Sequence, residues 1–351
     1  MLAVYKACIL INTQYQLHTH SATLEEKIMA IAGVLLALCC MISVGWASGS
    51  SLRFLAVGDW GGLPSKPYTT HIETSVAHAM GQTAAKYQTK FTLALGDNFY
   101  YDGVKHVDDA RFHETFENVY TDKALQTPWY IVAGNHDHRG NVDAEIEYSK
   151  KSHRWNFPHY YYPLQFSIPG SQATVSILML DTIQLCGNTK HDLAGDQPQG
   201  PADIKVANAQ WDWLEENLKN NKASYIIVAG HYPVISIAEH GPTKCLTQKL
   251  MPMLYKYKVT AFFSGHDHNL QHLQHTQSGV PVDYFVIGSG NFVVTSTAHH
   301  SAVPSGSLKY HGADKHNGGF AYIEATPQAM TLSFISGSGA HLYSHSMKPR
   351  K

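Results

Sequence analysis

Five short apolar stretches of this 351-residue sequence each end in a glycine followed by a side chain that can bind a metal ion. The stretches end, in chain order, in Gly58-Asp59, Gly96-Asp97, Gly134-Asn135-His136, Gly230-His231 and Gly265-His266-Asp267-His268. A single Gly-Asp or Gly-His pair would be typical of an ordinary turn. Five such clusters, each with a carboxylate, an amide or an imidazole, indicate that the stretches position one shared metal site.

Some of these groups favour a ferric ion. Asp59 offers a carboxylate, and Tyr100, three residues after Asp97, offers a phenol whose anion is a hard oxygen donor. A phenolate suits trivalent iron, because the ion stabilises its negative charge. We expect His268 to complete this ligand set and Asp97 to bridge to a second metal.

The remaining groups favour a divalent ion. Asn135 supplies an amide oxygen, while His231 and His266 supply imidazoles, a combination that suits Fe(2+), Zn(2+) or Mn(2+). A ferric and a divalent ion bring five positive charges, against three negative charges from two carboxylates and a phenolate. The surplus of about two positive charges predicts attraction of a phosphate dianion.

Alternating strands and helices would bring these clusters together. The apolar stretches are short and rich in Val, Ile and Phe, which predicts buried strands at 52–57, 91–95, 129–133, 225–229 and 260–264. We expect helices at 72–87, 110–119, 208–220 and 247–257. Further strands, expected to pair in a second sheet, lie at 174–180, 284–287, 320–325 and 330–335. This alternation predicts an α/β core built as a sandwich of two sheets flanked by helices.

The composition allows one large domain. Hydrophobic residues make up 44% of the chain, which is enough to fill a single large core. The net charge of −1 gives no basic field to attract nucleic acid. We therefore expect a monomer with one domain over residues 48–351, after an N-terminal extension and signal peptide over residues 1–47.

The signal peptide is predicted from an apolar run at 28–44. It is preceded by Lys27 and followed by Gly45-Trp46-Ala47, which is typical of a secretory signal cleaved near Ala47. An uncleaved membrane anchor is the alternative, because a run of about 17 residues is at the short limit for a membrane span. Met29 is an alternative start. This segment predicts a secreted or lysosomal protein.

Cysteine usage agrees with an oxidising compartment. Cleavage near Ala47 would remove Cys8, Cys39 and Cys40 and leave Cys186 and Cys245 as one pair. An even remainder in a secreted protein predicts a disulfide, with two free buried thiols as the alternative.

The five clusters, with Tyr100 in Gly96-Asp97-Asn98-Phe99-Tyr100, resemble the motifs of the purple acid phosphatases, most closely the small mammalian-type, tartrate-resistant members. The similarity covers nearly the whole chain after about residue 50. Tyr100 is the discriminating residue, because related metallophosphoesterases without it do not carry the purple ferric site. The resemblance implies a metallophosphoesterase-type two-sheet β-sandwich flanked by α-helices, and the hydrolysis of phosphate monoesters near acid pH.

The resemblance also implies a role for each candidate residue. The ferric ion would be bound by Asp59, Asp97, Tyr100 and His268, and the divalent ion by Asp97, Asn135, His231 and His266. Two metals would clamp the attacking and leaving oxygens of an in-line displacement, with hydroxide generated from bound water. His136 and His240 resemble the family's outer-sphere histidines, which hold the phosphate and assist the leaving group. An ordinary loop histidine is the alternative for His240.

The segment 187–201 is expected to form a long exposed loop. It corresponds to the family's loop over the active-site entrance, which proteases cut to raise activity, and we expect cleavage within 190–205. Asp192 or Asp196 could reach a metal-side histidine, or both could belong to a solvated charged loop.

Two other functions remain open from the sequence alone. One is a phosphodiesterase or pyrophosphatase on the same metals. The other is an iron-binding or redox protein that generates reactive oxygen species. The presence of both candidate acid histidines, His136 and His240, favours a hydrolytic enzyme over iron storage.

Overall fold

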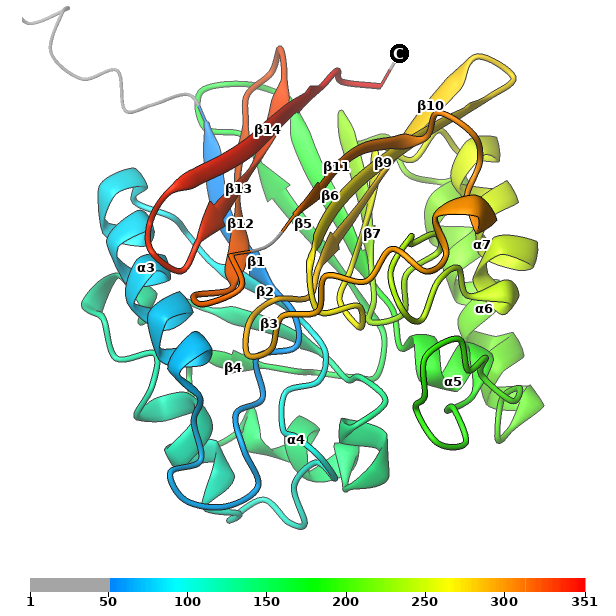
Figure 1. Cartoon of the computed structure of the whole chain (residues 1–351). Coiled ribbons are helices and arrows are strands. Elements are labelled where there is room, and N and C mark those ends of the chain that lie inside the picture. Colours follow the sequence, from blue (N-terminus) through cyan, green and yellow to red (C-terminus); the bar gives the residue numbers. More distant parts are fainter. Residues whose placement is uncertain (1–50, 313, 351) are drawn as a thin grey trace, which may run out of the picture. The chain divides into compact units, whose positions relative to one another are not determined.

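The computed structural model describes residues 51–312 and 314–350. The predicted signal peptide, its cleavage site and the first three cysteines lie outside these residues. Within the described ranges, no helix is long and apolar enough to cross a membrane. The described residues form two seven-stranded β-sheets with helices beside them, as Figure 1 shows. The expected two-sheet architecture is thereby confirmed.

The first sheet has the strand order β14-β13-β12-β1-β2-β3-β4. Its strands are β1 (Leu52–Val57), β2 (Thr92–Leu95), β3 (Trp129–Val132), β4 (Trp155–Asn156), β12 (Gly319–Ala325), β13 (Met330–Ser336) and β14 (His341–Met347). β1 to β4 run parallel, whereas β12 pairs antiparallel with β1. The strands of this sheet that lead to candidate ligands, β1 to β3, are almost wholly buried. Parallel strands covered on both faces read as continuous apolar runs, which is why the sequence identified them.

The second sheet has the order β11-β9-β10-β8-β7-β6-β5. Its strands are β5 (Tyr162–Ser167), β6 (Thr174–Met179), β7 (Tyr225–Ala229), β8 (Ala261–Ser264), β9 (Leu270–Gln277), β10 (Val280–Ile287) and β11 (Leu308–Gly312). β6, β7, β8 and β10 are parallel at its centre, and β9 forms a hairpin with β10.

The assignment of strands to sheets differs from the expectation. Strands β12 and β13 extend the first sheet, and two of the ligand-bearing strands, β7 and β8, belong to the second. A buried strand shows the same apolar run in either sheet, so the sequence pattern could not decide between them. The candidate ligands therefore come from both sheets.

Helices cover the outer faces of the sandwich (Figure 1). α3 (His71–Tyr87) packs on the first sheet, and α5 (Thr182–Cys186), α6 (Ile204–Lys219) and α7 (Lys244–Lys256) lie beside the second. One apolar cluster fills the space between the sheets, and another joins the second sheet to these last three helices. α4 (Val142–Tyr148) follows β3.

Three of the four predicted helices differ in their limits by more than one residue, and α7 begins at Lys244 rather than at residue 247. α6 begins at Ile204, because the side chain of Asp203 accepts hydrogen bonds from the amides of Lys205 and Val206 and caps the helix. The prediction began at residue 208, since the first turn is exposed and shows no apolar period. The helix expected at 110–119 is a short π-helix, Phe112–Glu117.

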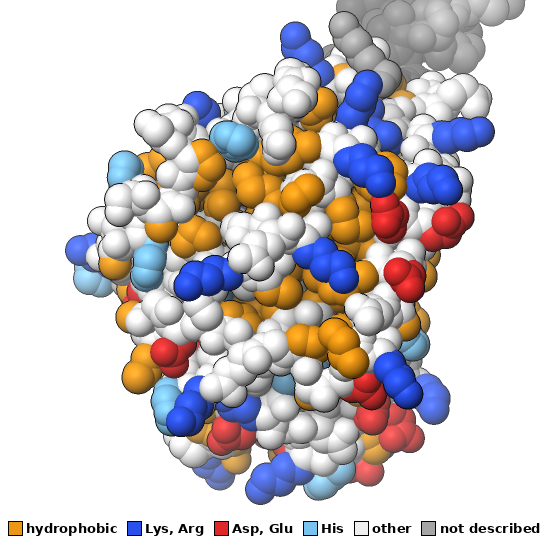
Figure 2. Space-filling model, turned by 90° about the vertical axis from the view of Figure 1, so that its right-hand side faces the viewer, with side chains coloured by type: hydrophobic (Ala, Val, Ile, Leu, Met, Phe, Trp, Pro, Cys, Tyr) orange, Lys and Arg blue, Asp and Glu red, His pale blue; other side chains and the backbone are white. Residues whose placement is uncertain are grey.

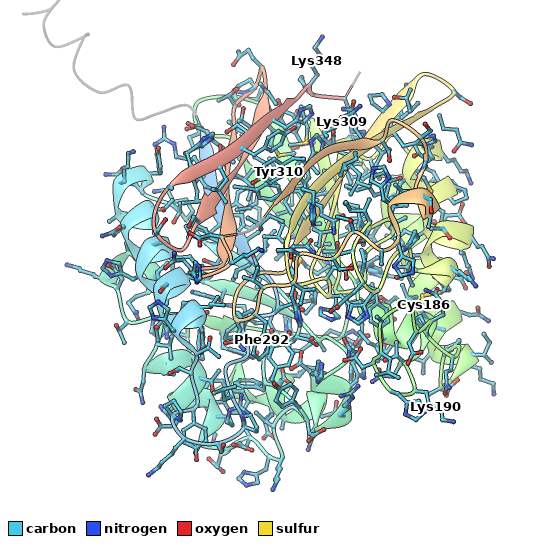
Figure 3. The ribbon with its side chains drawn as sticks, in the orientation of Figure 1. Cys186, Lys190, Phe292, Lys309, Tyr310 and Lys348 are labelled. Atoms are coloured by element: carbon cyan, nitrogen blue, oxygen red, sulfur yellow. A yellow bond between two sulfur atoms is a disulfide. The ribbon has the colours of Figure 1, made fainter. Side chains whose placement is uncertain are left out.

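The disulfide between Cys186 and Cys245 is confirmed, with a Cα–Cα distance of 5.7 Å. It joins the end of α5 to the first turn of α7. It also fixes the start of the loop that follows Cys186. Figure 3 labels Cys186 and shows Lys190 farther out on this loop, at the margin of the molecule.

The face of the molecule in Figure 2 mixes basic and acidic side chains around an apolar centre. Charges of both signs are interspersed there, which agrees with the net charge of −1 for the whole chain. Any attraction for an anion must therefore arise from a local site.

Candidate metal centre

The candidate ligands meet where strands of both sheets end. Each lies within five residues of its strand: Asp59 after β1, Asp97 and Tyr100 after β2, Asn135 after β3, His231 after β7, and His266 and His268 after β8. β7 pairs with β8, and β1 with β2. The amide of Gly265, before His266, donates to the carbonyl oxygen of His231. Loops at the carboxyl ends of parallel strands converge on one place, and these do so from two sheets.

The backbone is strained at three candidate ligands. Asp59, Asp97 and His266 have φ angles of 56°, 52° and 71°. Side chains other than glycine adopt such left-handed conformations rarely, at a cost of about 1–3 kcal/mol each. Such strain at several neighbouring polar residues is typical of functional sites, where the position of the side chain is kept despite the energetic cost to the backbone.

One half of the site contains Asp59, Asp97, Tyr100 and His268. The Tyr100 hydroxyl lies 3.2 Å from Asp59 Oδ1 and 3.0 Å from His268 Nε2. The ligand atoms of Asp59, Asp97 and His268 all lie within 4.8 Å of one another. These side chains therefore surround a space small enough for one ion to contact all of them.

The electrostatics of this half call for a cation. Burial raises the pKa of Asp59, although a hydrogen bond from His268 opposes the rise. Burial and the charges of Asp59 and Asp97 raise the pKa of Tyr100 well above its ordinary value. A phenolate here would therefore require a strongly charged neighbour, and the donor set fits trivalent iron.

The other half contains Asn135, His231 and His266, and shares Asp97. The Nδ1–H of His231 donates to the carbonyl oxygen of Leu95 at 2.9 Å, so Nε2 of the neutral imidazole bears a lone pair. This Nε2 faces Asn135 Oδ1 at 2.9 Å and Asp97 Oδ1 at 3.3 Å. Three lone-pair-bearing atoms thus face one another, and a cation bound by all of them would remove their repulsion.

Two buried groups support the same conclusion. Asn135 Nδ2 is buried without a hydrogen-bond partner, so its amide is not held in place by the protein alone. Burial and the neighbouring His240 and His231 lower the pKa of His266 well below its ordinary value. A neutral imidazole is the form that binds a metal. The residues of both halves therefore fit a dinuclear centre.

Both candidate acid histidines lie against this centre. His136 Nε2 is 3.9 Å from Asp97 Oδ2, and its Nδ1 donates to the carbonyl oxygen of Tyr101 at 2.6 Å. Burial alone would lower the pKa of His136, but Asp97 and a hydrogen bond to Asp192 raise it to about 9. The His240 ring stacks on the His266 ring at 4.1 Å.

The loop after Cys186 enters the site through Asp192. Its Oδ2 lies 2.9 Å from His136 Nε2, and its carboxylate shares a cluster with the imidazoles of His240 and His266. From the sequence alone, either this contact or a solvated charged loop was expected. The carboxylate of Asp196 instead accepts a hydrogen bond from the backbone amide of Leu193.

Several supporting residues were not recognised from the sequence. The carboxylate of Asp137 accepts hydrogen bonds from the amides of Asn98, Phe99 and Gly134, and so ties together the loops after β2 and β3. His138 Nε2 lies 2.7 Å from Asp181 Oδ2. The position of Asp137 between two histidines, in His136-Asp137-His138, could have marked it as a supporting residue. The local sequence does not predict which backbone amides its carboxylate would bind.

Asp267, which lies between the candidate ligands His266 and His268, contacts the loop that carries His240. Its Oδ1 accepts the backbone amide of His240 at 3.0 Å, and its Oδ2 accepts the hydroxyl of Ser236. It thereby fixes the stacking of His240 on His266.

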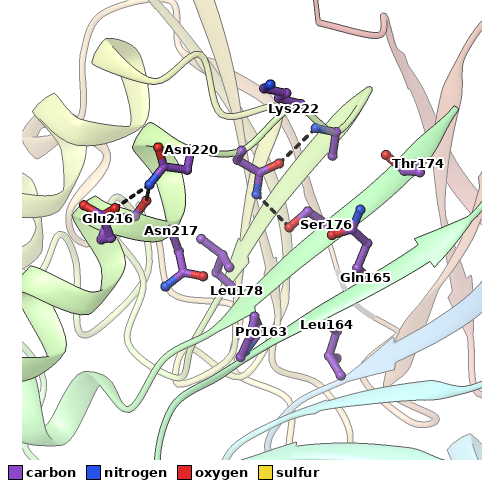
Figure 4. A pocket seen from close by; sticks show the side chains of 12 residues that line it. Pro163, Leu164, Gln165, Thr174, Ser176, Leu178, Glu216, Asn217, Asn220 and Lys222 are labelled. Atoms are coloured by element: carbon purple, nitrogen blue, oxygen red, sulfur yellow. Dashed lines mark hydrogen bonds between the residues drawn. The ribbon is translucent and has the colours of Figure 1, made fainter.

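A pocket of about 540 Å³ lies elsewhere, between β5, β6 and the end of α6 (Figure 4). Its lining is rich in amide side chains, among them Gln165, Asn217, Asn220 and Asn221. None of the predicted site residues lines it, so it is not part of the metal centre.

The family model for calcineurin-like phosphoesterases matches residues 52–270, a segment that includes all seven candidate ligands. The solved structure of GAP50, the anchor in the inner membrane complex of Plasmodium, has the same fold, with a TM-score of 0.72 and 23% identity, over 86% of this chain and 90% of that one. The fold, the family match and the candidate ligands at the strand ends define a metallophosphoesterase.

Relatives with higher sequence identity show which family of metallophosphoesterases the chain belongs to. The chain is 50% identical over 314 residues to tartrate-resistant acid phosphatase type 5 of Oryctolagus cuniculus, covering 88% of this chain and 95% of the rabbit protein. It is 30% identical over 302 residues to purple acid phosphatase 4 of Arabidopsis thaliana, covering 84% and 82%. The chain belongs to the tartrate-resistant purple acid phosphatases, which are dinuclear-metal acid phosphatases.

Proposed function

We propose that the protein hydrolyses phosphate monoesters at a centre of one ferric and one divalent ion, the latter Fe(2+), Zn(2+) or Mn(2+). The ferric ligands would be Asp59, Asp97, Tyr100 and His268, and the divalent ligands Asp97, Asn135, His231 and His266. The observation that carries this assignment is the position of Asp97. Its carboxylate lies 3.3 Å from His231 on one side and belongs to the Asp59–His268 cluster on the other.

The metals and the histidines would have different catalytic roles. When bound, the two ions supply positive charge for the phosphate and activate a water molecule as the nucleophile. His136 and His240 both lie near Asp192, and there they would donate hydrogen bonds to the phosphate oxygens. With its pKa raised to about 9, His136 is protonated at acid pH and can give a proton to the leaving oxygen.

A comparison of matched monoester and diester substrates tests this function. We expect kcat/KM for para-nitrophenyl phosphate at about pH 5 to exceed that for bis-para-nitrophenyl phosphate by roughly 100-fold, because a dianion gains more than a monoanion from the surplus positive charge. Equal values, or a preference for the diester, would indicate the phosphodiesterase. Bound iron without hydrolysis of either substrate would indicate the iron or redox function.

We further propose that the loop after Cys186 restrains activity until it is cut within 190–205. Asp192 places a carboxylate against His136 and near His240, where the phosphate oxygens would bind. Thr189, near the start of this segment, donates a hydrogen bond from its hydroxyl to Asp192, and α6 begins at Ile204, so the cut would fall between these anchors.

Replacing Asp192 by Ala is expected to raise kcat/KM about tenfold. The substrate would no longer have to displace the charge-assisted hydrogen bond between Asp192 and His136, and the free energy of one such bond corresponds to about this factor. Asp196→Ala is the matched control, because the carboxylate of Asp196 hydrogen-bonds to the backbone of the same loop, and the activity of this variant should equal that of wild type. Limited proteolysis should activate the wild type and the control but add little to Asp192→Ala. If cleavage and Asp192→Ala both leave the rate unchanged, the loop has no restraining role.

The localisation is also a proposal. The apolar run at 28–44 supports secretion or delivery to lysosomes, and the disulfide between Cys186 and Cys245 agrees with an oxidising compartment. One domain over residues 48–351 acting as a monomer completes the proposal. Small phosphate esters and phosphoproteins are the proposed substrates.

A further inference from the structure

A second cluster of metal-type ligands shares no residue with the strand-end centre. It consists of His272 on β9, Asp283 on β10 and His345 on β14. β9 and β10 belong to the second sheet, whereas β14 is the edge strand of the first. The three side chains therefore meet across the boundary between the two sheets.

The distances in this cluster match those between the ligands of one ion. His272 Nε2 lies 2.8 Å and His345 Nε2 3.2 Å from Asp283 Oδ1, and all three ligand atoms lie within 4.8 Å of one another. In a tetrahedral zinc site with bonds of about 2.0–2.1 Å, two ligand atoms lie about 3.3 Å apart. Shifts of a few tenths of an ångström would open the cluster to an ion.

Without an ion, the hydrogen bonding around Asp283 is crowded. His272, His345 and the Gln274 side-chain amide, at 2.9 Å, all approach the same oxygen, Oδ1. A carboxylate oxygen has two lone pairs, so three donors exceed its capacity. A bound cation would replace the imidazole protons with one positive charge shared by both rings and the carboxylate.

The surroundings orient the ligands as in known metal sites. His272 is fully buried, and its Nδ1 lies 2.8 Å from the Tyr343 hydroxyl, whose oxygen can accept a hydrogen bond from Nδ1–H and leave the Nε2 lone pair free to bind an ion. Burial lowers the pKa of His272, which favours the neutral, metal-binding form. Without an ion, burial would raise the pKa of Asp283, but hydrogen bonds from His272 and His345 lower it, so the carboxylate is charged.

Aromatic rings enclose the cluster on the inner side. Phe285 stacks on His272 at 4.5 Å, and Tyr310, labelled in Figure 3, stacks on Tyr343 at 4.7 Å. The His345 side chain remains 26% exposed, which leaves a path for an ion and a water ligand. An apolar shell around the ligands limits solvent access, as it does around known protein metal sites.

We propose that His272, Asp283 and His345 bind one divalent ion of the zinc class, with a water molecule or the Gln274 amide as fourth ligand. The ion joins the edge strand of the first sheet to the β9–β10 hairpin of the second. Its role is structural, because the cluster contributes no residue to the phosphatase centre.

The test is the zinc content of the full-length protein after equilibration with excess Zn(2+) and desalting, measured by elemental mass spectrometry. We expect His345→Ala and Asp283→Asn each to bind one equivalent less than wild type. His341→Ala is the matched control, since this exposed histidine on the same strand hydrogen-bonds only to Ser344. Metal at the phosphatase centre is common to all four proteins and cancels in the difference.

Thermal unfolding gives a second readout. Zinc at about 100 times Kd should raise the Tm of wild type and His341→Ala by about 4 °C more than that of His345→Ala. Phosphatase activity within about twofold of wild type shows that the variants are folded. Equal zinc content in all four proteins, with the same zinc-induced shift in Tm, would overturn the proposal and leave the cluster as a metal-free hydrogen-bond network.

Discussion

Replacing Asp97 by Asn should abolish phosphatase activity, with kcat/KM for para-nitrophenyl phosphate lowered by about 1,000-fold or more. Asp97 is the one carboxylate shared by both halves of the centre, so its loss weakens the binding of two ions at once. A factor of 1,000 corresponds to about 4 kcal/mol of lost transition-state stabilisation, a reasonable share for the metals.

The Asn side chain keeps the shape of Asp97 and removes only its charge. Asn also tolerates the left-handed backbone at this position, where φ is 52°. The variant should therefore fold, and near-native far-UV circular dichroism will check that it does. Metal content should fall from two equivalents to one or none. Asp212→Asn, at an exposed position of α6, is the control and should keep both metals and full activity. A fully metallated and active Asp97→Asn protein would show that Asp97 is not the bridge.

His136→Ala should lower turnover by tenfold or more while both metals stay bound. The imidazole lies 3.9 Å from Asp97 but belongs to neither proposed ligand set. It is held in place by its Nδ1 hydrogen bond to the carbonyl oxygen of Tyr101. A positioned acid typically contributes 10²–10⁴-fold, and the partner His240 would retain part of this effect.

The defect should depend on the leaving group. An alkyl phosphate needs a proton on its departing oxygen more than para-nitrophenyl phosphate does, so the loss should be larger for the alkyl ester. The measurement is kcat for both esters, with metal content determined on the same samples. Exposed His159 provides the control, and His159→Ala should behave as wild type. Unchanged turnover on both esters would remove His136 from the mechanism.

The positions of the candidate ligands could be predicted because they follow buried strands directly. β1, β2, β3, β7 and β8 are short, mostly apolar runs, and a glycine follows the end of each within two residues. The carboxyl ends of such strands converge, whichever sheet they belong to. For this reason the error about sheet membership left the site prediction unaffected.

Interactions between segments distant in the sequence were beyond prediction. The pairing of β12 with β1 depends on contacts some 270 residues apart, which no local pattern encodes. Asp137 supports the site through backbone amides, and any residue can supply those. Asp192 differs from Asp196 only in which way the folded loop turns each carboxylate.

The second ligand cluster was missed for a related reason. His272, Asp283 and His345 lie on three strands, and no glycine-plus-ligand motif marks them. His272 and Asp283 become neighbours through the register of the β9–β10 hairpin, and His345 reaches them from the other sheet.

The most direct test of the central claim is the visible absorption spectrum of the purified protein, compared between wild type and Tyr100→Phe. If Tyr100 binds a ferric ion as a phenolate, the wild type will be coloured by a broad charge-transfer band, and the variant will lack it. Tyr100 is 1% exposed, and Phe fills the same space, so the fold should be kept. A colourless wild type, or a band that persists in Tyr100→Phe, would contradict the proposed ferric site.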